Sequence, residues 1–209
     1  AENAEPGGGN VVLPELPHCA FRVVYAGNVG PVQGLENAVL AAGLLRDDGV
    51  ELAIAGDGLE LARLKALAAE KGIANVQFTG RLPLEAMPEL FARADALLVM
   101  LKTDALSRIS IPSKLQSYLQ SGKPVVAAIA GETAELVVEK GFGVACDPTS
   151  PEAVAQAVRS LVRMTGGERL AMGERARAVF REEFCGTVQG VALCELLERS
   201  GPSAGERCT

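Results

Sequence analysis

The segment 27–34, which reads GNVGPVQG, has a composition that suits an anion site. Its glycines, Gly27, Gly30 and Gly34, let the backbone approach a ligand closely. A helix that begins at Gly34 or Leu35 would offer unpaired N–H groups and a partial positive charge to a phosphate. The segment does not match G-x-G-x-x-G, and no Gly-Lys-Ser/Thr follows it. Taken alone, it fits a tight turn between a strand and a helix equally well.

Cationic side chains follow other apolar runs of the sequence and are expected near the same place. Arg81 comes directly after Gly80, and its guanidinium could stack on a base, pair with a phosphate or form a surface salt bridge. Arg108 and Lys114 surround a predicted helix start that Ser113 could cap. In a chain of net charge -6, such a group of cations predicts a small polyanion as ligand, for example a nucleotide diphosphate.

Residues for acid–base, nucleophilic or metal chemistry are scarce. The carboxylates that could reach the site are Asp104, Glu132 and Glu135, but they form no recognisable pair or triad, so the catalytic residues stay unassigned. The single histidine, His18, lies in an irregular stretch. The five cysteines contain no C-x-x-C pair, and we expect reduced thiols without a special role. We therefore predict no metal site and no cofactor.

An alternation of short apolar runs with helical segments must position these residues. Runs such as VELAIA and ALLVML are apolar almost throughout, which is typical of strands covered on both faces. The alternation predicts an α/β fold, a Rossmann-like doubly wound parallel sheet of about six strands flanked by helices. Strands are expected at 21–26, 50–55, 75–79, 95–101, 124–129 and 143–146, and helices at 33–46, 58–71, 84–93, 113–121, 132–140 and 151–164.

Ligands of such a sheet bind beyond the carboxyl ends of the strands, where the turns after each strand meet. The candidate residues above all lie in such turns. The turn after the second strand, Gly56-Asp57-Gly58, contributes no obvious ligand group, and we expect Asp57 to cap the next helix.

The chain divides into four parts. Residues 1–20 are rich in Gly and Pro and are predicted to be a linker or flexible lead-in. Residues 21–166 form the Rossmann-like domain, residues 167–200 a C-terminal helical extension with a break near 185–186, and residues 201–209 a mobile tail. The first residues lack a signal peptide and the chain does not start with Met, so we expect a fragment of a longer protein.

Composition excludes several classes of protein. The 20 Lys+Arg against 26 Asp+Glu argue against nucleic-acid binding, which needs a clustered cationic excess. A hydrophobic content of 48% is sufficient for a packed core. No apolar run reaches the roughly 18 to 20 residues that a bilayer span requires, so we predict no transmembrane segment in this chain.

Four stretches together resemble a known family: YAGNVGPVQGLENAVLAA, LAIAGDG, VQFTGRLPLEAMPELFARADALLVML and IPSKLQSYLQSGKPVVAAIAGETAELV. They are similar to the C-terminal, donor-binding half of family 4 glycosyltransferases with the GT-B fold. The branch they resemble makes lipopolysaccharide O-antigen and related surface sugars, where GN-x-G-x-x-QG and IPSK are usual. The resemblance covers residues 21–161 and keeps the order and spacing of the motifs.

The resemblance implies transfer of a sugar from a UDP- or GDP-linked donor to an acceptor hydroxyl, with retention of configuration and without a bound metal. In such enzymes helix N-termini and cations neutralise the leaving diphosphate. By resemblance, the first loop approaches the diphosphate, Gly80 and Arg81 hold the base, Ile111 to Lys114 cap the phosphates and Ser117 faces the ribose. The residues so assigned are Gly27, Asn28, Gly30, Gln33, Gly34, Gly80, Arg81, Arg108, Ile111, Ser113, Lys114 and Ser117.

The sequence departs from the family pattern at four positions. The family commonly has Arg and Lys in the first loop where this chain has Asn28 and Gln33, and two Glu residues that would fall near Ile109 and Ser117. Either Arg108 and Lys114 neutralise the diphosphate instead, which we favour, or the site has lost activity.

The resemblance also implies a second half. In a GT-B enzyme an N-terminal domain supplies the acceptor site and part of the catalytic machinery, so we expect this chain alone to be inactive. The whole protein would be cytoplasmic and could touch the inner face of the cell membrane through that other domain.

Two other functions remain open. Hydrolysing sugar-nucleotide epimerases share the fold but normally carry acid–base carboxylates and histidines in the donor half. A non-catalytic Rossmann-like dinucleotide module is disfavoured because the fingerprint is missing and Ala55-Gly56, instead of an acidic residue, ends the second strand.

Overall fold

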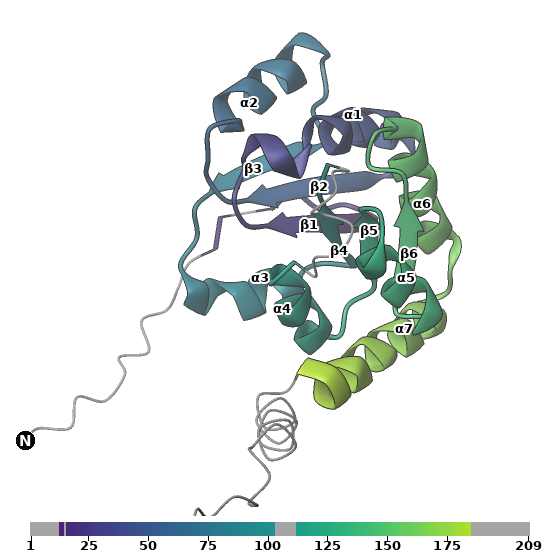
Figure 1. Ribbon diagram of the computed structural model, residues 1–209. Helices are drawn as coiled ribbons and strands as arrows, with labels where there is room; N and C mark the ends of the chain where they lie inside the picture. The colour runs from purple at the N-terminus through teal and green to yellow at the C-terminus, as the bar shows by residue number, and fades with distance from the viewer. Residues whose placement is uncertain (1–12, 15, 103–111, 185–209) are drawn as a thin grey trace, which may run out of the picture.

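The computed structural model describes residues 13–14, 16–102 and 112–184. Its centre is a parallel sheet in the order β3-β2-β1-β4-β5-β6 (Figure 1). The strands are β1 (Phe21–Ala26), β2 (Val50–Ala55), β3 (Val76–Gly80), β4 (Ala96–Met100), β5 (Val125–Ala128) and β6 (Gly143–Cys146). The predicted six-stranded, doubly wound α/β fold is thus confirmed, and each strand lies within about a residue of its expected range.

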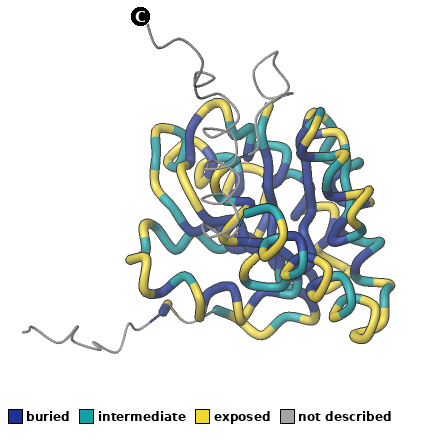
Figure 2. The backbone as a smooth tube through the Cα atoms, turned by 60° about the horizontal axis from the view of Figure 1, so that its bottom comes forward, coloured by how far each residue is buried: buried dark blue, intermediate teal, exposed yellow. Residues whose placement is uncertain are grey.

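Helices cover both faces of the sheet. On one face α1 (Glu36–Leu44), α2 (Leu61–Glu70) and α6 (Pro151–Arg163) bury their apolar side chains against the strands. On the other face lie α3 (Met87–Ala92), α4 (Lys114–Ser121), α5 (Glu132–Glu139) and α7 (Gly166–Val179). Buried positions therefore run through the centre of the molecule, and exposed ones gather at its outer turns (Figure 2). Because of this double cover, all six residues of β2 are buried, and all of them except Glu51 are apolar.

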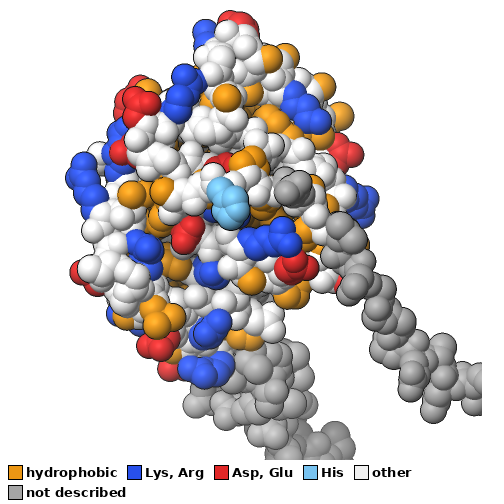
Figure 3. Space-filling model, turned by 180° about the vertical axis from the view of Figure 1, so that it is seen from behind, with side chains coloured by type: hydrophobic (Ala, Val, Ile, Leu, Met, Phe, Trp, Pro, Cys, Tyr) orange, Lys and Arg blue, Asp and Glu red, His pale blue; other side chains and the backbone are white. Residues whose placement is uncertain are grey.

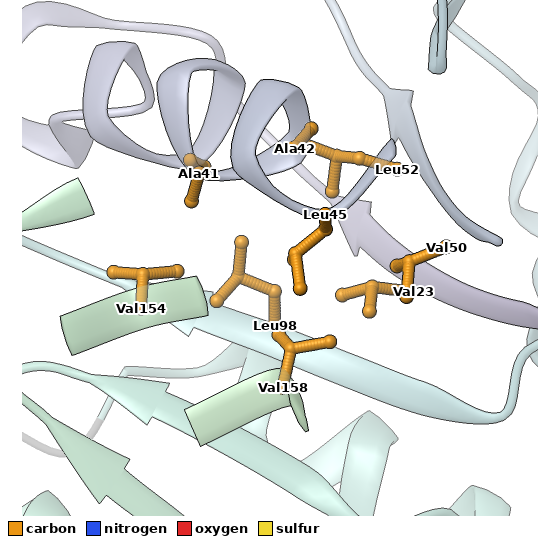
Figure 4. Close-up of a pocket in the computed structure, with 10 residues that line it drawn as sticks. Val23, Ala41, Ala42, Leu45, Val50, Leu52, Leu98, Val154 and Val158 are labelled. Carbon is orange, nitrogen blue, oxygen red and sulfur yellow. The ribbon is translucent and has the colours of Figure 1, made fainter. Parts of the chain in front are cut away.

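The core is tightly packed beneath α1 and α6. The small space shown in Figure 4 has a volume of about 20 Å³ and lies between these two helices and β1, β2 and β4. Only apolar side chains line it, among them Leu45, Leu98 and Val158. A water or ligand would find no hydrogen-bond partner there, so this space is a packing void.

The beginning of α1 differs from the prediction. A 3₁₀ turn, η1 (Pro31–Gln33), precedes the helix and overlaps the predicted range 33–46 at Gln33, and Gly34 closes it with a φ of 66°. Helix α1 itself begins at Glu36, one residue after the later of the two expected starts, Gly34 and Leu35, and Leu35 is its N-cap residue. Proline favours the first position of such a turn, and glycine accepts its left-handed end.

Two predicted helix caps are also wrong. The Asp57 carboxylate accepts a hydrogen bond from Gly58 N at 2.8 Å, within its own turn, and α2 has no side-chain cap. Ser113 flanks α4 in a helical conformation and makes no capping hydrogen bond. By contrast, Ser150 caps α6 and Thr165 caps α7 through their side-chain oxygens.

Helix α7 is held against α4 and α5 by close contacts. A Cβ added to Gly173 would lie 2.0 Å from the Gly122 carbonyl oxygen, so the two backbones nearly touch. Arg177 donates to Ser121 O at 3.0 Å, and Arg175 donates to Gly141 O at 2.5 Å. The helix continues into a π-helical turn, Phe180–Phe184. The predicted break near 185–186 and the tail 201–209 lie outside the described residues.

Part of the predicted lead-in packs on the domain. Leu13 is buried in the cluster beneath α3 and α4, and Arg22 of β1 donates to Pro17 O. Arg22 also pairs with the buried Glu51 at 2.9 Å.

Among the helices of the described residues, none has both the length and the apolar character that a membrane crossing needs.

Candidate functional site

The strand order reverses between β1 and β4. From β1 the chain continues to β2 on one side, while β4 begins the other half of the sheet. β1 and β4 are paired only at Val23↔Ala96 and Val24↔Leu97, before the carboxyl end of β1 is reached. The crevice beyond such a switch point is the usual ligand site of an open α/β sheet.

A cavity of about 550 Å³, here called the site cavity, opens at this switch point. It is lined by the loop after β1, the end of β4 and the start of α4: Ala26, Gly27, Asn28, Gln33, Met100, Leu101, Pro112, Ser113, Lys114 and Ser117. A second, larger groove of about 890 Å³ runs between α3 and α4 and shares Ala26, Gly27, Lys114 and Ser117 with it. The two spaces are therefore continuous.

The structure brings half of the predicted site residues into one place. Gly27, Asn28, Gln33, Ser113, Lys114 and Ser117 all line the site cavity. Gly30 and Gly34 border a neighbouring polar pocket of about 220 Å³ instead. In that pocket Arg63 is paired with Glu36 at 2.8 Å and with Glu60 at 2.6 Å, so its cation is already neutralised.

The remaining predicted residues lie elsewhere. Gly80 and Arg81 follow the edge strand β3, which β2 separates from β1, and neither lines the site cavity or the α3–α4 groove. Their assignment to the base stays a prediction. Arg108 and Ile111 lie outside the described residues, as does Asp104. Glu132 and Glu135 are exposed at the start of α5.

The loop after β1 is held by the loop after β2. Gly27 N donates to Ala55 O at 2.9 Å, and Val29 N donates to Asp57 O at 2.8 Å. Gly56 has a φ of +155°, and a Cβ at this position would lie 1.8 Å from the Gly27 carbonyl oxygen. The Gly56-Asp57-Gly58 turn thus shapes the site cavity from behind. The glycines on either side of Asp57 were the signal for this role, which the sequence analysis missed.

Asn28 and Gln33 order the first loop where the resemblance leads one to expect cations. The Gln33 side-chain oxygen accepts from Gly30 N at 3.0 Å and from the Asn28 amide at 3.5 Å. These contacts fix the loop without adding charge. Any cation for this cavity must come from another element.

Lys114 supplies a cation from the first turn of α4. Its Nζ donates to Tyr25 Oη at 2.6 Å and lies 3.9 Å from the centre of the Tyr25 ring. Burial lowers the pKa of Lys114 to about 8 and raises the pKa of Tyr25. A Cβ on Gly27 would lie 3.1 Å from this Nζ and would crowd the ammonium, and the φ of +140° also favours glycine here. Among the described residues no carboxylate forms an ion pair with Lys114.

Three residues of the site were missed in the sequence. The chain has two tyrosines, and both meet here. Tyr25 contacts Lys114, while the buried Tyr118 bonds both backbone groups of Ala26, accepting from its N at 2.8 Å and donating to its O at 3.2 Å. Lys102 donates its backbone N–H to Val32 O at 2.8 Å, and its side chain lies close to Gly34. A tyrosine within an apolar run looks like core, and no local pattern marks it otherwise.

The opposite edge of the sheet offers little chemistry. His18 is exposed and borders a pocket with Cys19 and Glu51 at the amino ends of the strands, on the face seen in Figure 3. Burial raises the pKa of the Cys19 thiol, which disfavours the reactive thiolate. Within the described ranges, no three His, Cys, Asp or Glu side chains gather as a metal site would require.

Comparison with known proteins agrees with this geometry. The family model described as "Glycosyl transferases group 1" matches residues 15–179. The putative colanic acid biosynthesis glycosyl transferase WcaI of Escherichia coli K12 is 32% identical over 183 residues, which are 84% of this chain and 45% of that protein. The chain thus spans less than half the length of this curated relative.

Solved structures share the fold at low sequence identity. Anabaena HepE, solved in complex with UDP, superposes with a TM-score of 0.73 at 22% identity, over 86% of this chain and 49% of that one. The C-terminal domain of LpcC, a group 1 family protein of Francisella tularensis, has a TM-score of 0.65 at 14% identity, over 78% of this chain and 86% of that domain. Most of this chain therefore shares its fold with these two structures.

Proposed function

Because the chain belongs to the glycosyl transferases group 1 family, we propose that it is the donor-binding part of an enzyme that transfers a sugar from a nucleotide diphosphate sugar. The observation that carries the proposal is Lys114, a half-buried cation without a carboxylate partner among the described residues, at the wall of the switch-point cavity. HepE, whose structure was solved with UDP, supports a UDP-linked donor, and a GDP-linked donor is the alternative.

The site would meet the diphosphate with fixed positive charge. Lys114 lies on one side of the first loop, near Gly27, and Lys102 lies on the other, near Gly34. The N-terminus of α4 points into the cavity with its partial positive charge. These groups would neutralise the charge that develops on the diphosphate as the sugar leaves. Arg108, which lies outside the described residues, would contribute a further positive charge. On this proposal no bound metal is needed.

The remaining assignments follow from the position of each residue around the diphosphate. Gly27, Asn28, Gly30, Gln33 and Gly34 would form the loop that closes on the phosphates. Ser113 and Ile111 would cap them at the start of α4. Ser117, one turn further along α4 and also in the cavity wall, would face the ribose. The base would extend toward Gly80 and Arg81 at the end of β3.

The acceptor and the second domain belong to the same proposal. WcaI is named for colanic acid biosynthesis, which supports a surface polysaccharide or lipopolysaccharide as the acceptor class. We place the acceptor site on an N-terminal domain and the reaction, with retention of configuration, in the cleft between the two. The described cavity wall contains no carboxylate or histidine, so the 209-residue chain should bind a donor and transfer no sugar. The complete protein would act in the cytoplasm, at the inner face of the membrane.

Isothermal titration of the chain with UDP, GDP and NAD tests the proposal. We expect UDP or GDP to bind and Lys114→Met to weaken that binding at least tenfold, since a hydrogen-bonded charge pair typically contributes about 1.5 to 3 kcal/mol. Lys71→Met is the matched control, because Lys71 lies at the end of α2 beside Glu70 and away from the cavity.

Other results would contradict parts of the proposal. Selective binding of NAD would favour a dinucleotide module instead. Equal affinity of the Lys114→Met and Lys71→Met variants would remove Lys114 from the site. Sugar transfer by the purified chain would show that the second domain is not required.

A further inference from the structure

We infer that Tyr25 is the positioning residue for Lys114: its phenol joins the ammonium of α4 to the backbone of the first loop and so fixes where the cation meets a bound diphosphate. The inference rests on the proposed function for the identity of the ligand. The contact itself is a property of the structure without any ligand.

The phenol uses both of its hydrogen-bonding capacities in this link. It accepts from Lys114 Nζ at 2.6 Å and donates to Asn28 O at 2.6 Å. Tyr25 is completely buried at the end of β1, so its position is set by the sheet. One rigid side chain therefore connects the first loop to the start of α4 through two hydrogen bonds.

The Tyr25 ring also restricts the direction of the ammonium. Nζ lies 3.9 Å from the ring centre, a distance at which the ring face attracts a cation. With one N–H on the phenol oxygen and the ring beneath it, the ammonium must direct its remaining hydrogens toward the cavity that Lys114 lines. A lysine on a free surface would spend most of its time in other rotamers.

Burial lowers the pKa of Lys114 to about 8, and a hydrogen-bond acceptor on Nζ favours the charged form against this effect. The groups that face Nζ are the Tyr25 phenol and ring of β1 and the backbone of Gly27 in the first loop. Tyr118, the titratable neighbour on α4, directs its hydroxyl to Ala26. Among the described residues the phenol oxygen is thus the acceptor that favours the charged form.

Tyr118 provides a matched control for Tyr25. Both tyrosines are buried, both lie beside the end of β1, and both bond a backbone carbonyl through the hydroxyl. Only Tyr25 contacts Lys114. Replacement of each by phenylalanine removes one buried hydroxyl and preserves the ring, so a difference between the two variants isolates the contact with the lysine.

The experiment measures Lys114 with and without nucleotide. The amine reactivity of Lys114 toward acetic anhydride, followed by mass spectrometry between pH 6.5 and 10 in the absence of ligand, gives its deprotonation midpoint, expected near pH 8 in the unmodified chain. Tyr25→Phe should move this midpoint down by about half a unit or more, because the ammonium loses its acceptor. It should also weaken UDP binding at pH 7 about tenfold. Tyr118→Phe should lower the thermal unfolding temperature and leave the midpoint unchanged.

An unchanged midpoint in Tyr25→Phe, or an equal shift in Tyr118→Phe, would overturn the inference. Should Tyr25→Phe not fold, Lys114→Met tests the contact from its other side: the NMR signal of the Tyr25 ring carbon that bears the hydroxyl should shift and that of Tyr118 should not, and an unchanged Tyr25 signal would overturn the inference. Failure of the unmodified chain to bind UDP or GDP, together with a shifted midpoint in Tyr25→Phe, would refute the proposed function and uphold the link between Tyr25 and Lys114.

Discussion

The ammonium of Lys114 lies in surroundings that are costly for a charge. Its ammonium is half-buried beside an aromatic ring, and the described residues offer it a phenol and no carboxylate. Burial without an opposite charge disfavours the charged form, which is why the pKa falls to about 8. A bound diphosphate would supply the missing negative charge. The residue is therefore better suited to the complex than to the free protein.

Replacing Lys114 by methionine should consequently stabilise the free chain. The Lys114 side chain holds its proton up to about pH 10.5 in the unfolded chain but only up to about pH 8 in the folded chain. The lysine therefore lowers the free energy of unfolding by its full amount below pH 8 and by less between pH 8 and 10.5. We expect Lys114→Met to raise the free energy of unfolding at pH 7 by about 1 to 2 kcal/mol, after allowance for partial solvent access. The gain should shrink as the pH rises from 8 to 10.5.

Urea denaturation at pH 7 and at pH 10 measures this effect. Lys71→Met, at an exposed position, should show little difference between the two pH values. A loss of stability at pH 7 in Lys114→Met would mean that the contacts with Tyr25 outweigh the cost of burial.

The sequence predicted Lys114 but not the residues that surround it. Its position at the start of a helix after a strand, and the IPSK motif, predicted that it lies in the crevice beyond the strands, and Lys114 lines the site cavity there. Tyr25 and Tyr118 stand in apolar positions of a strand and a helix, where tyrosine usually indicates core. Their hydroxyls become informative only when β1 and α4, far apart in the chain, are brought together.

At the scale of elements, two loops act as one unit. The loops after β1 and β2 exchange hydrogen bonds at Gly27, Val29 and Glu60, and glycines in the second loop let the backbones touch. The first loop therefore owes its shape to the neighbouring loop after β2. Strand positions were predicted well because buried parallel strands have an unmistakable apolar pattern. The 3₁₀ turn η1 was not, because its proline and glycine also fit a simple helix start.

Gly56→Ala tests this unit. The new Cβ would lie 1.8 Å from the Gly27 carbonyl oxygen, so the first loop must move, and the φ of +155° adds strain. We expect a loss of about 2 to 4 kcal/mol in the free energy of unfolding together with loss of nucleotide binding. Chemical denaturation and calorimetry measure the two effects.

Gly72→Ala is the control for backbone strain alone. Gly72 has a φ of +61°, but no atom lies within 4 Å of a Cβ added there. It should cost about 1 kcal/mol and leave the affinity for nucleotide unchanged. Equal losses in both variants would mean that contact between the two loops is unimportant.

At the scale of the whole molecule, α7 supports the site from a distance. Gly173 of α7 packs against Gly122 at the end of α4. Arg177 donates a hydrogen bond to the carbonyl oxygen of Ser121, the last residue of α4. The opposite end of α4 carries Lys114 into the cavity. The helical extension was expected from its apolar spacing, but its docking was not, because arginines and glycines give no sign of the surface they will meet.

Gly173→Ala should separate α7 from α4. Its Cβ would lie 2.0 Å from the Gly122 carbonyl oxygen, so we expect a loss of about 1 to 3 kcal/mol, as for other overpacked contacts, and a measurable decrease in nucleotide affinity. Gly167→Ala, with only Thr165 Oγ1 at 4.0 Å, should instead be neutral or stabilise α7 by up to about 1 kcal/mol. Thermal unfolding with and without UDP distinguishes them. Unchanged stability of Gly173→Ala would show that α7 can shift freely on α4.

The placement of the two tyrosines has a practical consequence. The chain contains no tryptophan, so its intrinsic near-ultraviolet emission comes from Tyr25 and Tyr118. Both rings lie between β1 and α4, and the Tyr25 hydroxyl accepts a hydrogen bond from Lys114. The tyrosine emission of the unlabelled protein therefore reports on the region between β1 and α4. We therefore expect the tyrosine emission to change when UDP is added, which fluorescence of the unlabelled protein can measure.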